Sequence, residues 1–288
     1  MSEHALDRPP VHVDVLRALL LEPAGPLTRI EVVPRTGSTN SDVVEALRAD
    51  PAAWPDRSLL VAEHQVDGRG RSGRTWETPA GAALTCTFVI RPTVGPAQLG
   101  WLPLLAGLGA ATALRARTGV PVRLKWPNDL MVPADDDLDE WGAWRKVGGI
   151  LTELVPLPDG PMVVVGLGVN VSQRPDELPV PSASSLALAG GEHLDRDGLV
   201  IALVEALDEV TQTWREAHGD PDASGLANRV AAVCVTLGTA VRVLLPGDRE
   251  LVGVATGLGP DGSLVVRDEH DVDHRVLAGD VRHVRTSR

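Results

Sequence analysis

Cysteine is scarce in this chain, and its scarcity limits how the fold is held together and what kind of site it can carry. Only Cys86 and Cys234 occur among the 288 residues. Two isolated thiols cannot form a disulfide framework, and they lack the spacing of a cysteine metal cluster. We interpret both as buried thiols of a protein in a reducing compartment.

The chain also has little that would direct it to a membrane. Its first ten residues, MSEHALDRPP, lack the basic start and the apolar stretch of a signal peptide. The apolar run from Trp101 to Leu114 is interrupted by proline and glycine and is shorter than the roughly 18 to 20 residues of a membrane span. We therefore predict a cytoplasmic protein without a membrane partner.

Positive charge is the third shortage. The 27 basic residues face 39 acidic ones, which gives a net charge of −12 and argues against a general nucleic-acid binder. Lysine occurs only as Lys125 and Lys146, and all other basic residues are arginine. This usage points to a need for a compact ammonium group at those two positions. The hydrophobic content of 43% is ordinary for a globular protein.

Hydrophobic periodicity predicts an α/β domain. A short amphipathic helix over 11–22 precedes it. Ser38 or Thr39 is a good N-cap for a helix to about Ala49. Further helices are expected over 97–118 and 197–218, and strands over 29–34, 59–63, 82–90, 122–125, 146–155 and 162–171.

The pattern changes after about Val235. Short β-rich runs over 240–245, 251–258, 263–267 and 274–284 alternate with turns at 246–248, 260–262 and 278–280, which predicts a small C-terminal β-barrel. Residues 133–144 are acidic and show no periodicity. We expect them to form a mobile insertion, with 135–139 as a solvated loop.

A glycine-arginine stretch, Gly68-Arg69-Gly70-Arg71-Ser72-Gly73, is poorly suited to a core or a helix. Glycine allows main-chain N–H groups to surround an anion, and arginine supplies planar donors for phosphate or carboxylate oxygens. A flexible surface loop or an RNA-binding patch would give the same pattern. Because the protein is acidic, a small anionic ligand suits this local basic segment better than a polynucleotide.

Four other polar groups lie near the ends of predicted strands, at 38–40, 125–129, 146–149 and 166–170. Open α/β sheets place their ligand sites at such ends. The sequence has no P-loop pattern, and no G-x-G-x-x-G leads from a strand into a helix as in dinucleotide-binding folds.

The residues of these segments and their order along the chain resemble those of the biotin protein ligases. The matching sequence motifs are Gly37-Ser38-Thr39-Asn40, Ala62 to Gln65 followed by GRGRSG and Arg74-Thr75-Trp76, Leu124 to Leu130 (LKWPNDL), Lys146 to Glu153 (KVGGILTE), and Gly166 to Val171 (GLGVNV). The resemblance extends from about residue 29 to the C-terminus.

The resemblance implies an enzyme that makes biotinyl-5′-AMP from biotin and ATP and then biotinylates one lysine of the biotin carboxyl carrier domain of an acyl-CoA carboxylase. It implies a mixed-sheet catalytic domain similar to class II tRNA synthetase cores at 29–235 and an SH3-like domain at 236–288. The residues before them are expected to form an N-terminal helical extension at 1–28. The resemblance also implies Mg²⁺ as cofactor. We expect a monomer or weak homodimer. Since no DNA-binding module is visible before residue 28, we expect no repressor role and no nucleic-acid partner.

Site residues follow from the matching positions. The resemblance implies biotin contacts for Ser38, Thr39, Asn40, Gln65, Gly68, Arg69, Arg71, Trp126, Lys146, Gly148 and Gly149. It implies nucleotide contacts for Arg71, Arg74, Trp76, Asn128 and Asn170, with Trp76 stacked on adenine. Arg71, Lys125, Lys146 and Asp129 are the implied catalytic residues, and Asn128 and Asp129 the implied metal neighbours.

Elementary chemistry supports these assignments. A carboxylate and a triphosphate must approach to about 3 to 3.5 Å, so nearby cations must offset their repulsion. A reactive acyl adenylate also needs shielding from water, which a closing GRGRSG loop would supply. The alternative interpretations are that Ser38 only caps a helix, that Trp76 belongs to the core, and that Asn170 satisfies its own backbone. A lipoate or octanoyl transferase, a vitamin sensor and an RNA binder are the rival functions.

Overall fold

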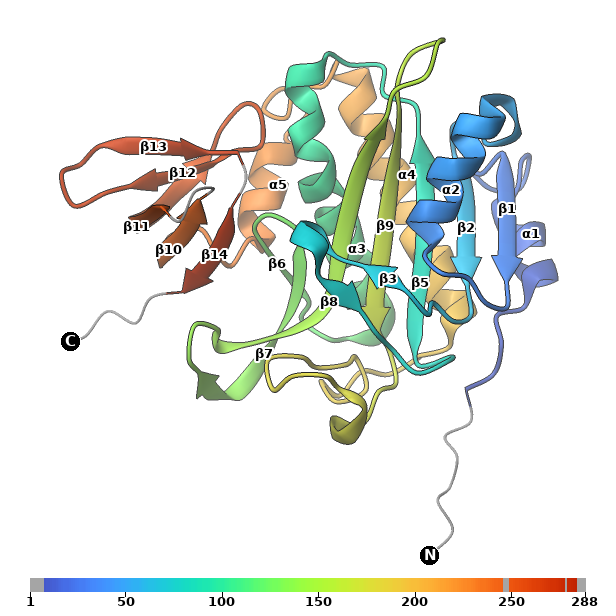
Figure 1. Cartoon of the computed structure of the whole chain (residues 1–288), viewed down its shortest axis with the longest axis horizontal. Helices are drawn as coiled ribbons and strands as arrows, with labels where there is room; N and C mark the ends of the chain where they lie inside the picture. Colours follow the sequence, from blue (N-terminus) through green and yellow to red (C-terminus); the bar gives the residue numbers. More distant parts are fainter. Residues whose placement is uncertain (1–7, 246–248, 278, 284–288) are drawn as a thin grey trace, which may run out of the picture.

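We describe a computed structural model of the chain for residues 8–245, 249–277 and 279–283 (Figure 1). The helices are α1 (Val13–Leu20), α2 (Thr39–Ala49), α3 (Leu102–Thr118), α4 (Arg196–Glu216) and α5 (Leu226–Val233). The strands of the catalytic domain are β1 (Arg29–Val33), β2 (Ser58–Ala62), β3 (Gly68–Arg69), β4 (Thr75–Trp76), β5 (Ala83–Ile90), β6 (Arg123–Lys125), β7 (Asp129–Leu138), β8 (Gly142–Val155) and β9 (Met162–Asn170). Those of the C-terminal domain are β10 (Ala240–Leu245), β11 (Arg249–Leu258), β12 (Leu264–Arg267), β13 (Asp273–Val276) and β14 (Asp280–His283).

A seven-stranded mixed sheet forms the centre of the catalytic domain, in the order β1-β2-β5-β9-β8-β7-β6. Strands β1 and β2 are parallel, whereas every other neighbouring pair in this sheet is antiparallel. The α/β fold class with a mixed sheet is therefore confirmed.

The two faces of this sheet carry different layers. Helices α3 and α4 pack together on one face, and α2 covers part of the other (Figure 1). On β9, Val163, Val165, Leu167 and Val169 belong to the larger core beneath α3 and α4, while Met162 and Val164 pack under α2. The next positions on the α2 face are glycines, because strand side chains alternate between faces. The apolar layer on this face therefore ends at Gly166 and Gly168.

Helix α3 is apolar along most of its length. Residues Pro96–Thr118, which include it, are long and apolar enough to cross a membrane by length and composition, contrary to the prediction from residues 101–114. Of their most apolar window, 67% is buried inside the protein, and α3 packs on α4, α5 and β8. Its composition thus matches a position in the core.

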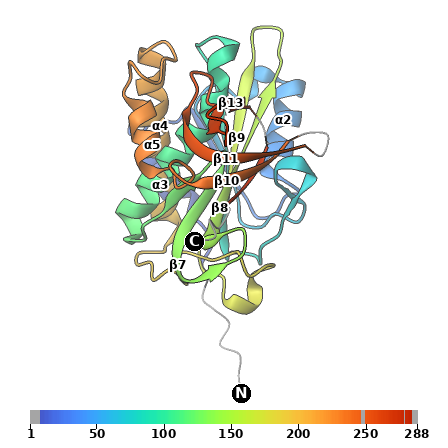
Figure 2. The same cartoon turned by 90° about the vertical axis from the view of Figure 1, so that its left-hand side faces the viewer.

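The C-terminal domain is a five-stranded antiparallel sheet in the order β13-β12-β11-β10-β14, shown in front of the catalytic domain in Figure 2. Its core side chains continue the large core of the catalytic domain. Two buried indoles reach across the junction. Trp101 donates to the carbonyl of Pro260 at 3.0 Å and Trp126 to that of Gly262 at 3.0 Å. The predicted turns at 246–248 and 278–280 lie wholly or partly outside the described residues.

One sequence prediction of local structure is wrong, and a second is confirmed in position but not in its side-chain contact. Residues 133–144 were expected to be an insertion without periodic structure, with 135–139 as a solvated loop, but they form the end of a β7–β8 hairpin, with Leu138 paired to Gly142. Helix α2 does begin at Thr39, but the Ser38 side chain makes no capping hydrogen bond. Ser38 is buried and lines the cavity described below.

Candidate active site

One cavity of about 360 Å³ lies over the glycine-bearing face of the sheet. Most of the predicted site residues line it. They are Ser38, Thr39, Asn40, Gln65, Arg69, Arg71, Arg74, Trp76, Lys125, Trp126, Asn128, Asp129, Lys146 and Gly149. These residues come from four separate segments of the sequence, 38–40, 65–76, 125–129 and 146–149, which the fold brings together. The volume of the cavity is in the range of small-molecule binding sites.

The floor of the cavity is made of strand glycines. A Cβ atom on Gly168 would lie 2.7 Å from Cε2 of Trp76, and one on Gly166 would lie 2.3 Å from Oδ1 of Asn40. Any larger residue would therefore displace these neighbours. The glycines at this point of β9 leave room for Trp76 and Asn40 to approach the sheet.

A polar network closes the cavity at the start of α2. The Gln65 Oε1 atom accepts from the backbone N–H and from the hydroxyl of Thr39, both at 2.8 Å. The Thr87 hydroxyl lies 2.8 Å from that of Thr39 and 2.7 Å from Oδ1 of Asn40. The Asn40 amide donates to the carbonyl of Leu151 at 3.1 Å. Since these groups orient one another, they present a fixed pattern of donors and acceptors at this end.

The glycine-arginine stretch forms a small hairpin over the cavity. Strands β3 and β4 pair through Gly68 with Trp76 and Arg69 with Thr75, and the Gly70 N–H donates to the carbonyl of Arg74 at 2.7 Å. The Trp76 indole is half-buried against Gly149 and Gly168. Its Nε1 is buried and has no hydrogen-bond partner within the described part of the chain. This nitrogen faces the sheet, 2.8 Å from the position that a Cβ atom on Gly168 would take.

Charges at the centre of the cavity are paired across neighbouring segments. The Lys146 ammonium lies 2.6 Å from Oδ1 of Asp129 and 5.9 Å from the centre of the Trp76 ring. Arg71 donates to Oδ1 of Asn128 at 3.2 Å, and Asn128 donates to the carbonyl of Ile150 at 2.6 Å. These contacts hold the cationic groups in place before a ligand arrives.

The β7–β8 hairpin supplies residues that the sequence did not reveal. The Trp141 ring lies under the Lys125 ammonium, 4.2 Å from it, and both residues line the cavity. Its neighbour Glu140 forms an ion pair with Arg282 of β14, which also reaches the rim. Lys125 ends β6, the edge strand of the sheet, and therefore lies at the end of the cavity next to the C-terminal domain.

The cavity is strongly cationic, although the protein is acidic overall. Six basic side chains line it against the two carboxylates of Asp129 and Glu140. Basic side chains gathered over a glycine floor favour an extended anionic ligand. Among the described residues, no group of three His, Cys, Asp or Glu side chains could hold a metal ion.

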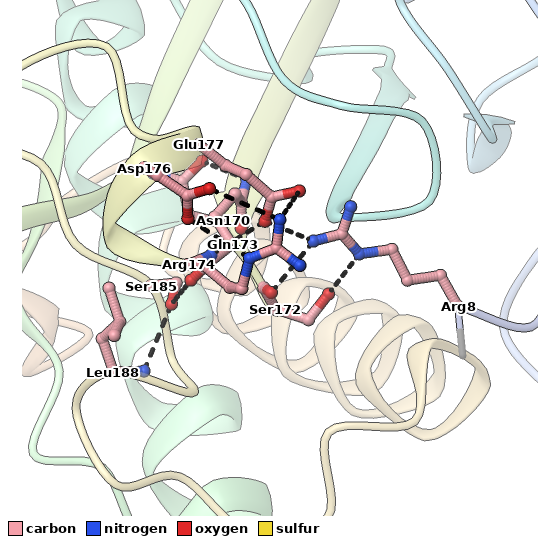
Figure 3. A network of polar contacts seen from close by, with 9 residues as sticks. All are labelled: Arg8, Asn170, Ser172, Gln173, Arg174, Asp176, Glu177, Ser185 and Leu188. Atoms are coloured by element: carbon pink, nitrogen blue, oxygen red, sulfur yellow. Dashed lines mark hydrogen bonds and ion pairs between the residues drawn. The ribbon is translucent and has the colours of Figure 1, made fainter. Parts of the chain in front are cut away.

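Three predicted residues lie outside the cavity lining: Gly68, Gly148 and Asn170. A Cβ on Gly68 would lie 2.3 Å from the carbonyl oxygen of Trp76, so this glycine allows the close β3–β4 pairing. Asn170 is buried, donates to the carbonyl of Ser184 at 2.9 Å, and accepts from Gln173 at 2.8 Å. Its side chain therefore anchors the segment that follows β9 (Figure 3).

This segment, residues 171–188, is called the wall loop here because Val180, Ser182 and Ala183 line the cavity. It runs beside β8, where the Lys146 N–H donates to the carbonyl of Ser182 and the Ser184 N–H to the carbonyl of Lys146, both at 2.8 Å. Its base is tied by the Ser185 hydroxyl, which donates to the carbonyl of Gln173 at 2.8 Å. No local sequence pattern marked this loop as part of the site.

Comparison with known proteins agrees with this architecture. The profile of the biotin/lipoate A/B protein ligase family matches residues 32–170, and that of the biotin protein ligase C-terminal domain matches residues 236–284. A biotin--[acetyl-CoA-carboxylase] ligase from Mycobacterium tuberculosis is 36% identical over 292 residues, which cover 99% of this chain and 100% of that protein. One from Paracoccus denitrificans is 32% identical, over 82% of this chain and 93% of its own length.

A solved structure shows the same fold. The biotin protein ligase from Aquifex aeolicus in complex with biotin and ATP superposes with a TM-score of 0.71 and 26% identity, covering 90% of this chain and 100% of that one. Fold and cavity together define an ATP-dependent ligase with a class II synthetase-like catalytic domain and an SH3-like C-terminal domain. The chain belongs to the biotin/lipoate A/B protein ligase family, within it to the biotin protein ligases.

Proposed function

We propose that this enzyme makes biotinyl-5′-AMP in the cavity described above and transfers the biotinyl group to a lysine of a carboxylase biotin-carrier domain. The observation that carries the proposal is the cationic cavity over a glycine floor, with a fixed polar network at one end. The relatives named as biotin--[acetyl-CoA-carboxylase] ligases and the Aquifex structure with biotin and ATP support the choice of substrates.

The first step joins two anions. The biotin carboxylate oxygen attacks the α-phosphorus of ATP, the bond to the bridging oxygen breaks, and pyrophosphate leaves with that electron pair. Arg71 and Lys146 lie at the centre of the cavity, where they offset the repulsion between carboxylate and phosphate. Lys125, at the far end, is placed to receive charge on the departing pyrophosphate. We assign Trp76 to adenine and Arg74 and Asn128 to the nucleotide.

The polar network at α2 orients the other substrate. The Asn40 amide N–H groups are taken by Leu151 and Glu153, and Gln65 and Thr39 fix each other. The Ser38 hydroxyl, the Gln65 amide N–H groups and the Asn40 Oδ1 atom then suit the ureido group of biotin. Because the reacting carboxylate lies at the opposite end of biotin, this places it toward Arg69, Arg71 and Lys146. Holding both reactants in one orientation lowers the entropic cost of the reaction.

The donor set fits Mg²⁺ only as an ion held mainly by phosphate oxygens. Asp129 offers two carboxylate oxygens, of which Oδ1 contacts Lys146, and Asn128 offers one amide oxygen, which accepts from Arg71. Mg²⁺ binds proteins through one or two carboxylates plus substrate phosphates, which suits this arrangement. When bound, it would supply further positive charge at the phosphates.

In the second step the carrier lysine must arrive as a neutral amine. Its nitrogen attacks the carbonyl carbon of the adenylate, AMP leaves with the bonding pair, and the proton released from the amine passes to the Asp129 carboxylate and from there to water. Asp129 is the carboxylate that we assign to orient this amine, because it lies 2.6 Å from Lys146 at the centre of the cavity. The β3–β4 hairpin would shield the adenylate from water during the interval.

The decisive experiment is exchange of labelled pyrophosphate into ATP. We expect this exchange to depend on biotin. In a second assay with labelled biotin, we expect the label to appear on a purified carrier domain. Exchange that depends on lipoate and not on biotin would establish the rival acyl transferase, and ligand binding without exchange would indicate a vitamin sensor. The domain boundaries after 28 and 235, the cytoplasmic location, the absence of membrane and nucleic-acid partners, and a monomer or weak homodimer stay predictions.

A further inference from the structure

The segment that precedes α1, residues 8–12, is fixed to the catalytic domain beside the exit of β2. Arg196 donates to the carbonyl of Pro9 at 2.6 Å and pairs with Glu63, also at 2.6 Å. The Val11 N–H donates to Glu63 at 2.6 Å. Glu63 lies two residues before Gln65, so this segment is joined to the strand that leads into the cavity.

The same segment also reaches the wall loop through one side chain. The Arg8 guanidinium donates to Oγ of Ser172 and to its carbonyl oxygen, both at 3.2 Å, and pairs with Glu177 at 2.6 Å (Figure 3). The side chains of Arg8 and Glu177 are only 14% and 16% exposed. Glu177 also accepts from the Arg174 N–H at 2.9 Å, which closes the turn at the start of the loop.

These contacts form a continuous connection to the reacting centre. Arg8 holds the first turn of the wall loop, and the last part of that loop is bonded to the backbone of Lys146. Charge-assisted hydrogen bonds with little exposure restrain their partners more than surface pairs do. The segment 8–12 therefore ties two walls of the cavity together from outside, through Glu63 on one side and Glu177 on the other.

We propose that Arg8 is a positioning residue for the ligase reaction, which holds the wall loop against Lys146 and so retains the adenylate between the two steps. This inference rests on the proposed function. Arg8 touches no substrate and acts through Ser172 and Glu177. Loss of its guanidinium frees the first turn of the loop while the cationic groups of the cavity stay in place.

The test uses the full chain and four variants: Arg8→Ala, Arg8→Lys, Glu177→Gln and, as a control, Arg17→Ala on the exposed face of α1. The enzyme is loaded with biotin and labelled ATP, and release of labelled adenylate is followed after a chase. We expect release about tenfold faster in Arg8→Ala and Glu177→Gln, an intermediate rate in Arg8→Lys, and no change in the control. The KM for biotin should stay within about twofold.

Two further measurements separate this role from a purely structural one. Backbone amides of 172–188 should exchange hydrogen faster in Arg8→Ala than in the control. The double variant Arg8→Ala/Glu177→Gln should release adenylate no faster than either single variant, because both break the same tie. If Arg8→Ala does not fold, the isosteric Glu177→Gln carries the test.

Faster amide exchange with unchanged adenylate release would overturn the inference, as would rates in Arg8→Ala that equal those of the control. Neither result would affect the proposed function, since the unaltered enzyme would still form adenylate. Failure of the unaltered enzyme to form adenylate would instead reject the proposed function.

Discussion

The glycine floor gives the sharpest test of the cavity. In Gly168→Ala the new Cβ would lie 2.7 Å from Cε2 of Trp76, whereas ordinary contacts begin at 3.4 Å, so the ring must move by about 0.7 Å. A displacement of about 1 Å in a reacting group can cost about 100-fold in rate. We therefore expect kcat/KM for biotin-dependent pyrophosphate exchange to fall about 10- to 100-fold, or about 1.4 to 2.7 kcal/mol.

A matched variant separates this effect from that of adding a methyl group to a strand. A Cβ atom on Gly257 of β11 would have nothing within 4 Å, so Gly257→Ala should leave exchange unchanged. Because the Trp76 ring is half-buried and can yield toward the cavity, Gly168→Ala should lower the free energy of unfolding by only about 1 kcal/mol. Exchange by Gly168→Ala at the rate of the unaltered enzyme, with both proteins folded, would refute the assignment of Trp76 to the ligand site.

Three further variants test separate features. Lys146→Ala should slow adenylate formation about 100- to 1000-fold while biotin binding, measured by calorimetry, weakens less than tenfold; equal losses would contradict its role at the α-phosphate. Burial raises the pKa of the Cys86 thiol from 9.0 to about 12, so above pH 9 the thiol ionises in the unfolded chain but stays protonated in the folded protein. The stability that the buried, neutral thiol contributes is therefore fully present below pH 9 and is lost as the pH rises toward 12. Denaturant unfolding should therefore show a stability advantage over Cys86→Ala that shrinks between pH 8 and 11, and a constant difference would contradict burial. Gly262→Ala should lower the free energy of unfolding by about 2 to 5 kcal/mol, because its φ is +79° and the new Cβ would lie 2.5 Å from the Gly100 carbonyl oxygen. Gly238→Ala, at φ +77° in open space, should lower it by only about 1 to 2 kcal/mol.

The sequence predicted the catalytic sheet well because its signals are local. Runs of β-branched residues marked β5 and β9, and turn residues separated the strands of the C-terminal domain. Motif order then grouped the polar residues that line the cavity. These predictions needed only hydrophobic periodicity, turn residues and a family resemblance based on several sequence motifs.

What the sequence missed depends on contacts between distant residues. The acidic run before Trp141 gave no strand signal, because its pairing within the hairpin and the Glu140–Arg282 pair decide its structure. Asn170 has the composition of a ligand contact, but Ser184 and Gln173 use its amide. Arg8 is one of many arginines, and its partner Glu177 is 169 positions away. No local pattern could have joined them.

The junction between the domains has a consequence for how this enzyme can be divided. Trp101 and Trp126 are 1% and 2% exposed, and each donates its indole N–H to the turn before β12. A fragment ending near residue 235 would uncover both rings and leave both donors without these acceptors, one of them beside Asn128 and Asp129. The C-terminal strands therefore complete the interior of the catalytic domain, and expression of residues 29–235 alone should yield an aggregation-prone protein.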